Sequence, residues 1–297
     1  MKKDPAFWCL ALHTLPGVRM ARVAQILDSL EQQKRGPEAF FQETPETWRK
    51  EFGLPAPVVS YLETQKSEHL QKTEALAQQL RQLGVWILSC QDPRFPRDLE
   101  ALPYRVPLLY GHGPLDLLHH RPRIAFLNSR FIRPEAEAAL RRAASAVFQD
   151  LRLAVVTSPF RTAYRACAEV AVAHGAPVIL VGDRGILFLL QSPWVRHLKG
   201  PKLLLTPFAP EDVGTPGAGM VRDDLIGCLA DVLVGFEVYE GGNMERQFRE
   251  ALKAGKTALM WQRKGSSLAN PRLIRQGALP FATEAELVAR LRDELGL

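Results

Sequence analysis

The chain has 297 residues, which is more than one compact core usually holds, so we expect two domains of unequal size. Apolar residues make up 46% and charged residues 24%, proportions that argue against a disordered or a fibrous protein. The net charge of +6 permits a polyanionic partner without requiring one.

Cysteine and histidine spacing indicates neither a metal site nor a disulfide framework, and we expect no cofactor. The cysteines lie far apart with no Cys-x-x-Cys pair, so buried free thiols are expected. The His119–His120 pair lacks a carboxylate at ligand spacing. No segment reaches the roughly 18 apolar residues of a membrane span, so we expect a cytoplasmic protein without a membrane partner. The four cysteines are Cys9, Cys90, Cys167 and Cys228.

Residues 1–84 are predicted to form a small all-helical domain, because apolar residues recur there at helical spacing. Within this domain, residues 15–21 partly resemble the hairpin of a helix-hairpin-helix, or SAM-like, module. In such hairpins a tight glycine turn aims backbone N–H groups at a phosphate. The second glycine of that hairpin is Arg19 here, and an ordinary turn between helices explains Pro16 and Gly17 equally well.

Residues 85–297 are predicted to form a Rossmann-like α/β domain. Short apolar runs alternate there with amphipathic segments, which is typical of a parallel sheet with helices on both faces. Ligands of such sheets bind at the carboxyl ends of the strands, so the loops after the runs are the candidate sites. The predicted strands are residues 85–88, 123–127, 153–157, 177–181, 202–205, 232–236 and 257–261.

The loop Asn128-Ser129-Arg130 follows the first central strand and is a candidate phosphate site. A strand that feeds a helix exposes free N–H groups to an anion. Asn128 can adopt a positive φ but narrows the space that a glycine would leave. Arg130 supplies a planar cation suited to phosphate. The alternative is a surface arginine paired with Glu135 or Glu137.

The stretch Gly241-Gly242-Asn243 opens a predicted helix and is a second candidate anion loop. Glycines allow a phosphate to approach the backbone at a helix N-terminus. The structural alternative is a simple turn in which Asn243 caps the helix. Nearby, Glu237 and Glu240 follow a predicted strand and offer carboxylates to a bound nucleotide.

In this order the segments resemble the DprA (Smf) family of DNA-processing proteins over almost the whole chain. Residues 92–99 are similar to the family's Tyr-Pro-x-x-Leu entry, and residues 265–278 to its Ser-x-Gly-x-Asn-x-Leu-Ile-x-x-Gly-Ala segment. The family has Gly-Ser-Arg where this chain has Asn128-Ser129-Arg130. Residues 282–297 are expected to form one helix, with no room for the winged-helix tail of some family members.

Two further loops are site candidates through this resemblance. Ser158 and Arg161 are what remains of the family's Ser-Gly-Leu-Ala-Arg-Gly-Ile-Asp loop, although Pro159 lacks the backbone donor of a glycine. Arg222 is retained from the family's Arg-Asn-Arg stretch. Asp223 and the following aspartate replace its asparagine and arginine, which disfavours a phosphate, or else they cap the following helix.

The resemblance implies a single-stranded DNA-binding protein without catalytic activity. It would act in natural transformation or recombination by protecting single strands and loading the RecA recombinase, and it would work as a homodimer. A second hypothesis is a nucleotide-binding protein that cleaves an N-glycosidic bond with Glu237 or Glu240. A third is a diverged paralogue that acts through protein contacts alone.

Overall fold

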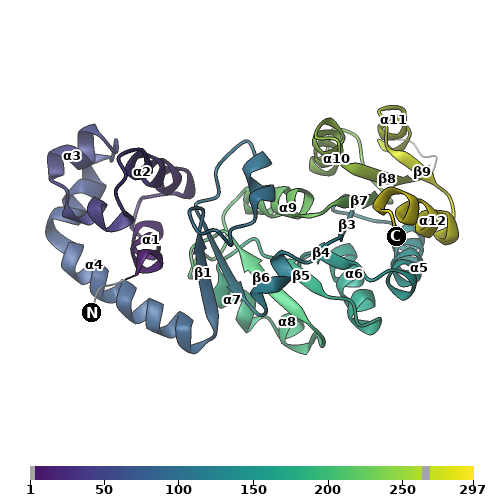
Figure 1. Cartoon of the computed structure of the whole chain (residues 1–297), viewed down its shortest axis with the longest axis horizontal. Helices are drawn as coiled ribbons and strands as arrows, with labels where there is room; N and C mark the ends of the chain where they lie inside the picture. The colour runs from purple at the N-terminus through teal and green to yellow at the C-terminus, as the bar shows by residue number, and fades with distance from the viewer. Residues whose placement is uncertain (1–3, 263–267) are drawn as a thin grey trace.

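The computed structural model describes residues 4–262 and 268–297. Residues 265–267, the start of the segment that resembles the family's Ser-x-Gly-x-Asn stretch, lie outside this range. A cluster of helices at the N-terminal end packs against one edge of a nine-stranded sheet (Figure 1). Among the described residues, no helix is both long enough and apolar enough to cross a bilayer. The four cysteines are free thiols, and all but the half-buried Cys90 are buried.

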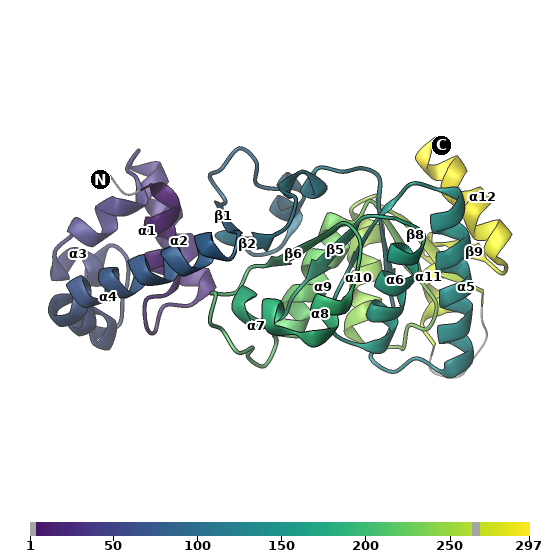
Figure 2. The same cartoon turned by 90° about the horizontal axis from the view of Figure 1, so that it is seen from below.

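The N-terminal helices bury their apolar faces against one another. The first begins at Pro5, where the Asp4 carboxylate accepts the Phe7 N–H at 2.8 Å and caps the helix. The long α4 ends two residues before the first strand, and in the second view it leads directly into the sheet (Figure 2). The elements are α1 (Pro5–His13), α2 (Met20–Gln32), η1 (Pro37–Gln42), α3 (Pro45–Lys50) and α4 (Ala56–Gln82).

The predicted hairpin is the turn between α1 and α2. Gly17 adopts a φ of +80°, and a Cβ at this position would lie 3.0 Å from Val58 of α4. The side chains of Leu15 and Val18 are buried, and the Val18 N–H donates to the Leu15 carbonyl at 3.1 Å. The turn therefore has a packing role of its own.

The helical segment and the sheet share one continuous apolar core. His13 at the end of α1 lies 2.8 Å from the Tyr110 hydroxyl of β2, and the two rings are stacked. Burial lowers the pKa of His13 to about 4, so this histidine is neutral in the folded protein at neutral pH.

The sheet has the strand order β1-β2-β6-β5-β4-β3-β7-β8-β9. The strands β6, β5, β4, β3, β7 and β8 are parallel, as predicted, and β9, which was not predicted, joins them in parallel. By contrast, β1 and β2 pair antiparallel with each other, and β2 pairs antiparallel with β6. The sheet is therefore mixed. The strands are β1 (Val85–Ser89), β2 (Leu108–His112), β3 (Arg123–Leu127), β4 (Ala154–Thr157), β5 (Val178–Val181), β6 (Lys202–Thr206), β7 (Val232–Gly235), β8 (Thr257–Trp261) and β9 (Leu279–Phe281).

Helices cover both faces of the sheet, which confirms the predicted Rossmann-like architecture. Side chains alternate along β3, so that Ile124 and Phe126 join the core under α5, α6 and α12, and Ala125 and Leu127 join the core under α9 and α10. The remaining elements are η2 (Arg97–Ala101), η3 (Leu115–Leu118), α5 (Pro134–Asp150), α6 (Thr162–Ala173), α7 (Ile186–Gln191), α8 (Pro193–His197), α9 (Ala218–Leu229), α10 (Asn243–Lys253), α11 (Asn270–Arg275) and α12 (Glu284–Leu295).

The chain reverses its direction of winding at β3. It proceeds from β3 outward through β4, β5 and β6, and then returns to place β7 on the other side of β3. The crevice outside the carboxyl ends of β3 and β7 is thus the topological switch point, where open α/β sheets bind their ligands.

Candidate nucleic-acid interface

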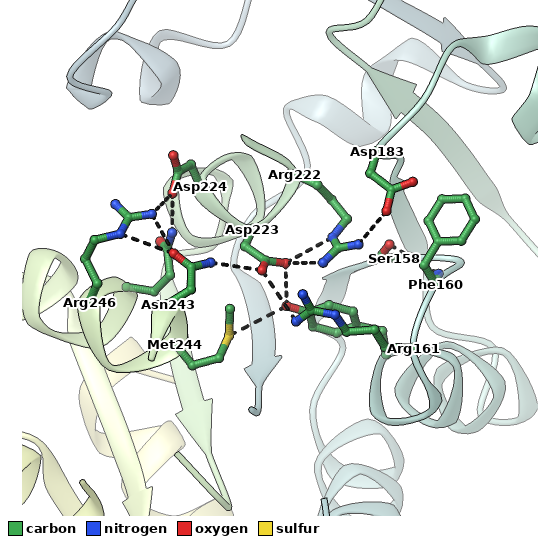
Figure 3. A network of polar contacts seen from close by, with 12 residues as sticks. Ser158, Phe160, Arg161, Asp183, Arg222, Asp223, Asp224, Asn243, Met244 and Arg246 are labelled. Atoms are coloured by element: carbon green, nitrogen blue, oxygen red, sulfur yellow. Dashed lines mark hydrogen bonds and ion pairs between the residues drawn. The ribbon is translucent and has the colours of Figure 1, made fainter. Parts of the chain in front are cut away.

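The predicted site residues gather at the carboxyl edge of the sheet. They lie in the loops after β3, β4 and β7 and on the facing ends of α9 and α10. Figure 3 shows the polar network around Asp223, which joins the loops after β4 and β5 to α9 and α10. The geometry separates the predicted residues into two groups, those engaged within the protein and those facing solvent.

Arg130 faces solvent beside an exposed aromatic ring. Its guanidinium lies 5.8 Å from the centroid of the Phe131 ring, and Phe131 is 77% exposed. In the described part of the chain Arg130 forms no ion pair, and Glu137 pairs with Arg141 instead. Glu137, one of the two partners considered for Arg130, is thus engaged elsewhere, and a cation and an aromatic ring lie side by side at the surface after β3.

Asn128 and Ser129 hold the backbone at the end of β7. The Asn128 Oδ1 accepts the N–H groups of Phe236 and Glu237 at 3.0 and 3.1 Å, and the Ser129 Oγ accepts that of Tyr239 at 2.8 Å. Asn128 is only 2% exposed, and its Nδ2 has no hydrogen-bond partner among the described residues. The structure thus gives these two residues a structural role in joining β3 to β7.

Asn270 completes a clamp on the other side of the same segment. Its Oδ1 accepts the Val238 N–H at 3.1 Å, and its Nδ2 donates to the carbonyls of Phe236 and Trp261 at 2.8 and 3.0 Å. All its polar groups are satisfied although it is fully buried. The end of β7 is consequently fixed by asparagines from both sides.

The loop after β4 carries Ser158 and Arg161. Ser158 is fully buried, and its Oγ accepts the Phe160 N–H at 3.3 Å, so this hydroxyl shapes the loop. Arg161 adopts a φ of +71° and a ψ of 142°, a conformation that is unfavourable for a side-chain-bearing residue. Its guanidinium lies 3.5 Å from Asp223 and 5.9 Å from the Tyr164 ring centroid, and its side chain is 28% exposed.

Arg222 is buried between two carboxylates. Its side chain is 2% exposed, its Nη1 donates to Asp183 at 2.8 Å, and its Nη2 and Nε donate to Asp223 at 2.8 and 3.0 Å. Burial would lower the pKa of Arg222, but the carboxylates outweigh burial and raise it, so the residue stays charged. Its cation is neutralised inside the protein, in contrast with the phosphate contact expected from the sequence.

Asp223 is the centre of this network. Besides Arg222, its carboxylate accepts the Tyr164 hydroxyl at 2.9 Å and the Asn243 Nδ2 at 3.0 Å. Burial, followed by the charge of Asp223, raises the pKa of Tyr164 well above its usual value, so the hydroxyl remains a donor. The predicted capping role is wrong, because both Asp223 and Asp224 lie inside α9, where Asp224 binds Arg246 at 2.5 Å.

The Gly241-Gly242 loop is occupied by a carboxylate of the same chain. The Gly241 N–H donates to the Glu245 Oε2 at 2.7 Å, and the other carboxylate oxygen of Glu245 pairs with Arg272. Gly242 is the N-cap of α10, and Asn243 is its first helical residue. The alternative in which Asn243 caps this helix is therefore wrong. Gly241 has a φ of +71°, a left-handed conformation that favours glycine at this position.

Glu237 and Glu240 are the carboxylates that would cleave an N-glycosidic bond under the second functional hypothesis. Glu237 is fully buried, and its two oxygens accept the backbone N–H and the Nε of Arg133 at 2.8 and 2.7 Å. Glu240 is exposed on the surface of the loop. A carboxylate bound in this way at the start of α5 is poorly placed to reach a ribose, so the geometry disfavours glycosidic cleavage by Glu237.

Comparisons with known proteins identify the architecture. DNA processing protein A (DprA) from Streptococcus pneumoniae superimposes with a TM-score of 0.73 at 17% sequence identity, covering 97% of this chain and 98% of that one. The chain has a DprA-like fold. DprA from Helicobacter pylori, whose structure concerns its mode of binding single-stranded DNA, matches with a TM-score of 0.61 at 15% identity, covering 71% of this chain and 97% of the other.

The comparison with protein-family models and the comparison with curated sequences gave no match. The DprA-like fold is therefore supported by three-dimensional similarity, and it extends through the N-terminal helices as well as the sheet, because the match spans nearly the whole chain. At this level of identity the likeness concerns the fold, and the role of each loop must come from its own geometry.

Sequence reasoning missed two residues at the carboxyl edge of the sheet, Asp183 and Arg184. Arg184, in the loop after β5, places its guanidinium 4.5 Å from the centroid of the half-buried Phe160 ring, and Asp183 anchors Arg222. The sequence signal that could have identified them is their position in the loop after the predicted strand 177–181. An arginine and an aromatic ring thus lie close together at a second place on this edge.

Proposed function

We propose that this protein binds single-stranded DNA along the carboxyl edge of its sheet. The observation that carries the proposal is the pair formed by Arg130 and Phe131, an exposed cation that forms no ion pair among the described residues, beside a 77% exposed ring at the topological switch point. Single strands are bound by cationic surfaces that follow the phosphates and by aromatic faces on which bases stack. Arg184 of the loop after β5, which is paired with Asp183, lies over Phe160 of the loop after β4 and offers a second cation and ring.

The partial exposure of Arg161 fits the same interface. Its guanidinium is held by Asp223 and Tyr164 but keeps 28% of its side-chain surface, so it can add a weaker phosphate contact between the two pairs. The DprA-like fold adds support, since the Helicobacter pylori relative with this fold is described through its binding of single-stranded DNA. We include in the proposal that the protein has no catalytic activity, acts in the cytoplasm as a homodimer, and passes the strand to RecA.

Anisotropy titrations of a labelled single strand, the corresponding duplex and a nucleotide monophosphate test this proposal. We expect tight, salt-sensitive binding of the single strand, weaker binding of the duplex, and no competition by the monophosphate. Equal affinity for duplex and single strand would refute strand selectivity. Absence of binding to either at low salt would refute the proposed function and favour a protein that acts through protein contacts alone.

A further inference from the structure

Positive charge is concentrated in the segments that follow β7 and β8. The described residues 241–262 and 268–278 contain six arginines and lysines but only two glutamates. Their net charge of +4 is two thirds of the +6 that the whole chain carries. A local excess of one sign of charge attracts a ligand of the opposite sign. The six basic residues are Arg246, Arg249, Lys253, Lys256, Arg272 and Arg275.

Four of these six cations are engaged within the protein. Three of them pair with a carboxylate, and the fourth donates to backbone carbonyls at the end of α9. Arg249 and Arg275 are exposed, and in the part of the chain that the structure describes their side chains form no ion pair or hydrogen bond. The engaged cations are Arg246 with Asp224, Lys253 with Glu250, Arg272 with Glu245, and Lys256 with the carbonyls of Gly227, Cys228 and Ala230.

The helices α10 and α11 lie next to each other and run in the same direction (Figure 1). Each connects two parallel strands, β7 to β8 and β8 to β9, so both run from the carboxyl edge of the sheet to the amino edge. Their first turns are joined by the ion pair of Glu245 and Arg272. Towards their ends, a Cβ at Gly277 would lie 4.0 Å from the Leu252 side chain. The two helices are therefore aligned turn by turn.

This alignment places Arg249 and Arg275 side by side. Arg249 follows Glu245 by four residues and Arg275 follows Arg272 by three, and side chains at these spacings share one face of a helix. Both arginines thus lie one turn beyond the ion pair, on the faces that the two helices turn towards each other. Glu245, the carboxylate on this face of α10, is already bound by Arg272. Two like charges left together repel each other, and an anion between them would relieve the repulsion.

We propose that Arg249 and Arg275 bind a phosphodiester of a DNA single strand that continues from the carboxyl edge along α10. Guanidinium groups present planar pairs of N–H donors that match the oxygens of a phosphate. The site is continuous with the carboxyl edge, because Asn243 at the start of α10 binds Asp223 and Arg249 follows about 9 Å along the helix axis. The assignment of the anion to a DNA strand rests on the proposed function.

The salt dependence of single-stranded DNA binding tests this site. The probe is an oligonucleotide of about 16 nucleotides, at the upper end of the usual site sizes of single-strand binders. Arg249→Gln combined with Arg275→Gln removes both charges, and Arg249→Lys combined with Arg275→Lys retains them. The matched control is Arg97→Gln combined with Arg152→Gln, which removes two exposed arginines without an ion pair among the described residues.

We expect the glutamine pair to reduce the slope of log affinity against log salt by about 0.7, because one phosphate contact is lost. The lysine pair should retain the slope and bind less tightly, since an ammonium group lacks the planar donors of a guanidinium. The control should keep the wild-type slope. The melting temperature of the glutamine pair should not fall below that of the wild type, because a repulsion between like charges is removed.

A glutamine pair with the wild-type slope would overturn the proposal. An equal loss of slope in the control would also overturn it, because any surface cation would then contribute. A loss seen only with the corresponding duplex would refute the assignment to a single strand.

Failure of the proposed function gives a different result, since the wild-type protein would then bind no strand at all. A thermal-shift titration with inorganic phosphate, against sodium chloride at matched ionic strength, tests the anion site in that case as well. We expect phosphate to raise the melting temperature of the wild type and to leave that of the glutamine pair unchanged. An equal response of the two proteins would overturn the site.

Discussion

The strongest consequence of the structure for stability concerns Arg222. Replacement by alanine removes the guanidinium that holds Asp183 and Asp223 and strands the fully buried Asp223 carboxylate. Breaking a buried ion pair by deleting one partner costs roughly 3–5 kcal/mol. Asp223 retains the Tyr164 hydroxyl, the Asn243 amide and the Arg161 guanidinium at 3.5 Å, so we place the loss at the lower end, about 3 kcal/mol.

Urea unfolding followed by circular dichroism measures this loss, with Arg152→Ala as the control. Arg152 is exposed at the amino edge of the sheet, so its removal should change the free energy of unfolding by less than about 0.5 kcal/mol. Adding Asp223→Asn to Arg222→Ala should cost less than the sum of the two single changes, because the stranded charge is gone. An Arg222→Ala protein of nearly wild-type stability that no longer binds single-stranded DNA would refute this reasoning and return Arg222 to the interface.

Two further predictions concern pH and the β7 clamp. Because burial lowers the pKa of His13 to about 4, the unfolded chain binds the proton first as pH falls, and stability declines below about pH 6.5. Between pH 7 and pH 5 this decline should be about 2 kcal/mol in urea unfolding, and a His13→Asn variant that retained the full pH dependence would contradict the assignment. Asn270→Ala leaves three backbone groups without their partner and should cost about 3 kcal/mol. A loss below about 1 kcal/mol would show that the clamp is not needed to hold β7.

Apolar periodicity was sufficient to predict most of the fold, because a buried parallel strand is a short run of apolar residues with turns at its ends. It could not identify β9, whose Leu279-Pro280-Phe281 stretch is short, contains proline and lies at the edge of the sheet. It also did not identify β2, nor could it show that β2 pairs antiparallel with β6, since these strands are far apart in the sequence.

The loops that carry the candidate residues were predicted in position, but the contacts inside them were not. The loops after β3, β4 and β7 do meet at one edge, as the carboxyl ends of parallel strands must. What sequence reasoning missed is the pairing inside that edge. Arg222 is bound by Asp183 as well as by its neighbour Asp223, and Glu245 is bound by Arg272. Asp183 and Arg272 are too far from their partners in the chain for these pairs to be recognised from the sequence. Asn128 likewise gave no sign that its oxygen would bind the end of β7.

At the interface, salt dependence separates the effect of charge from that of base stacking. Arg130 should contribute one phosphate contact, and each contact with a single strand adds about 0.7 to the slope of log affinity against log salt. Phe131 should contribute base stacking of about 1–3 kcal/mol, which does not depend on salt.

The salt dependence of single-stranded DNA binding by Arg130→Ala, Phe131→Ala and the control Arg152→Ala tests the central claim most directly. We predict that Arg130→Ala reduces the slope by about 0.7, that Phe131→Ala weakens binding at an unchanged slope, and that Arg152→Ala alters neither. Wild-type affinity and slope in both Arg130→Ala and Phe131→Ala would contradict the account.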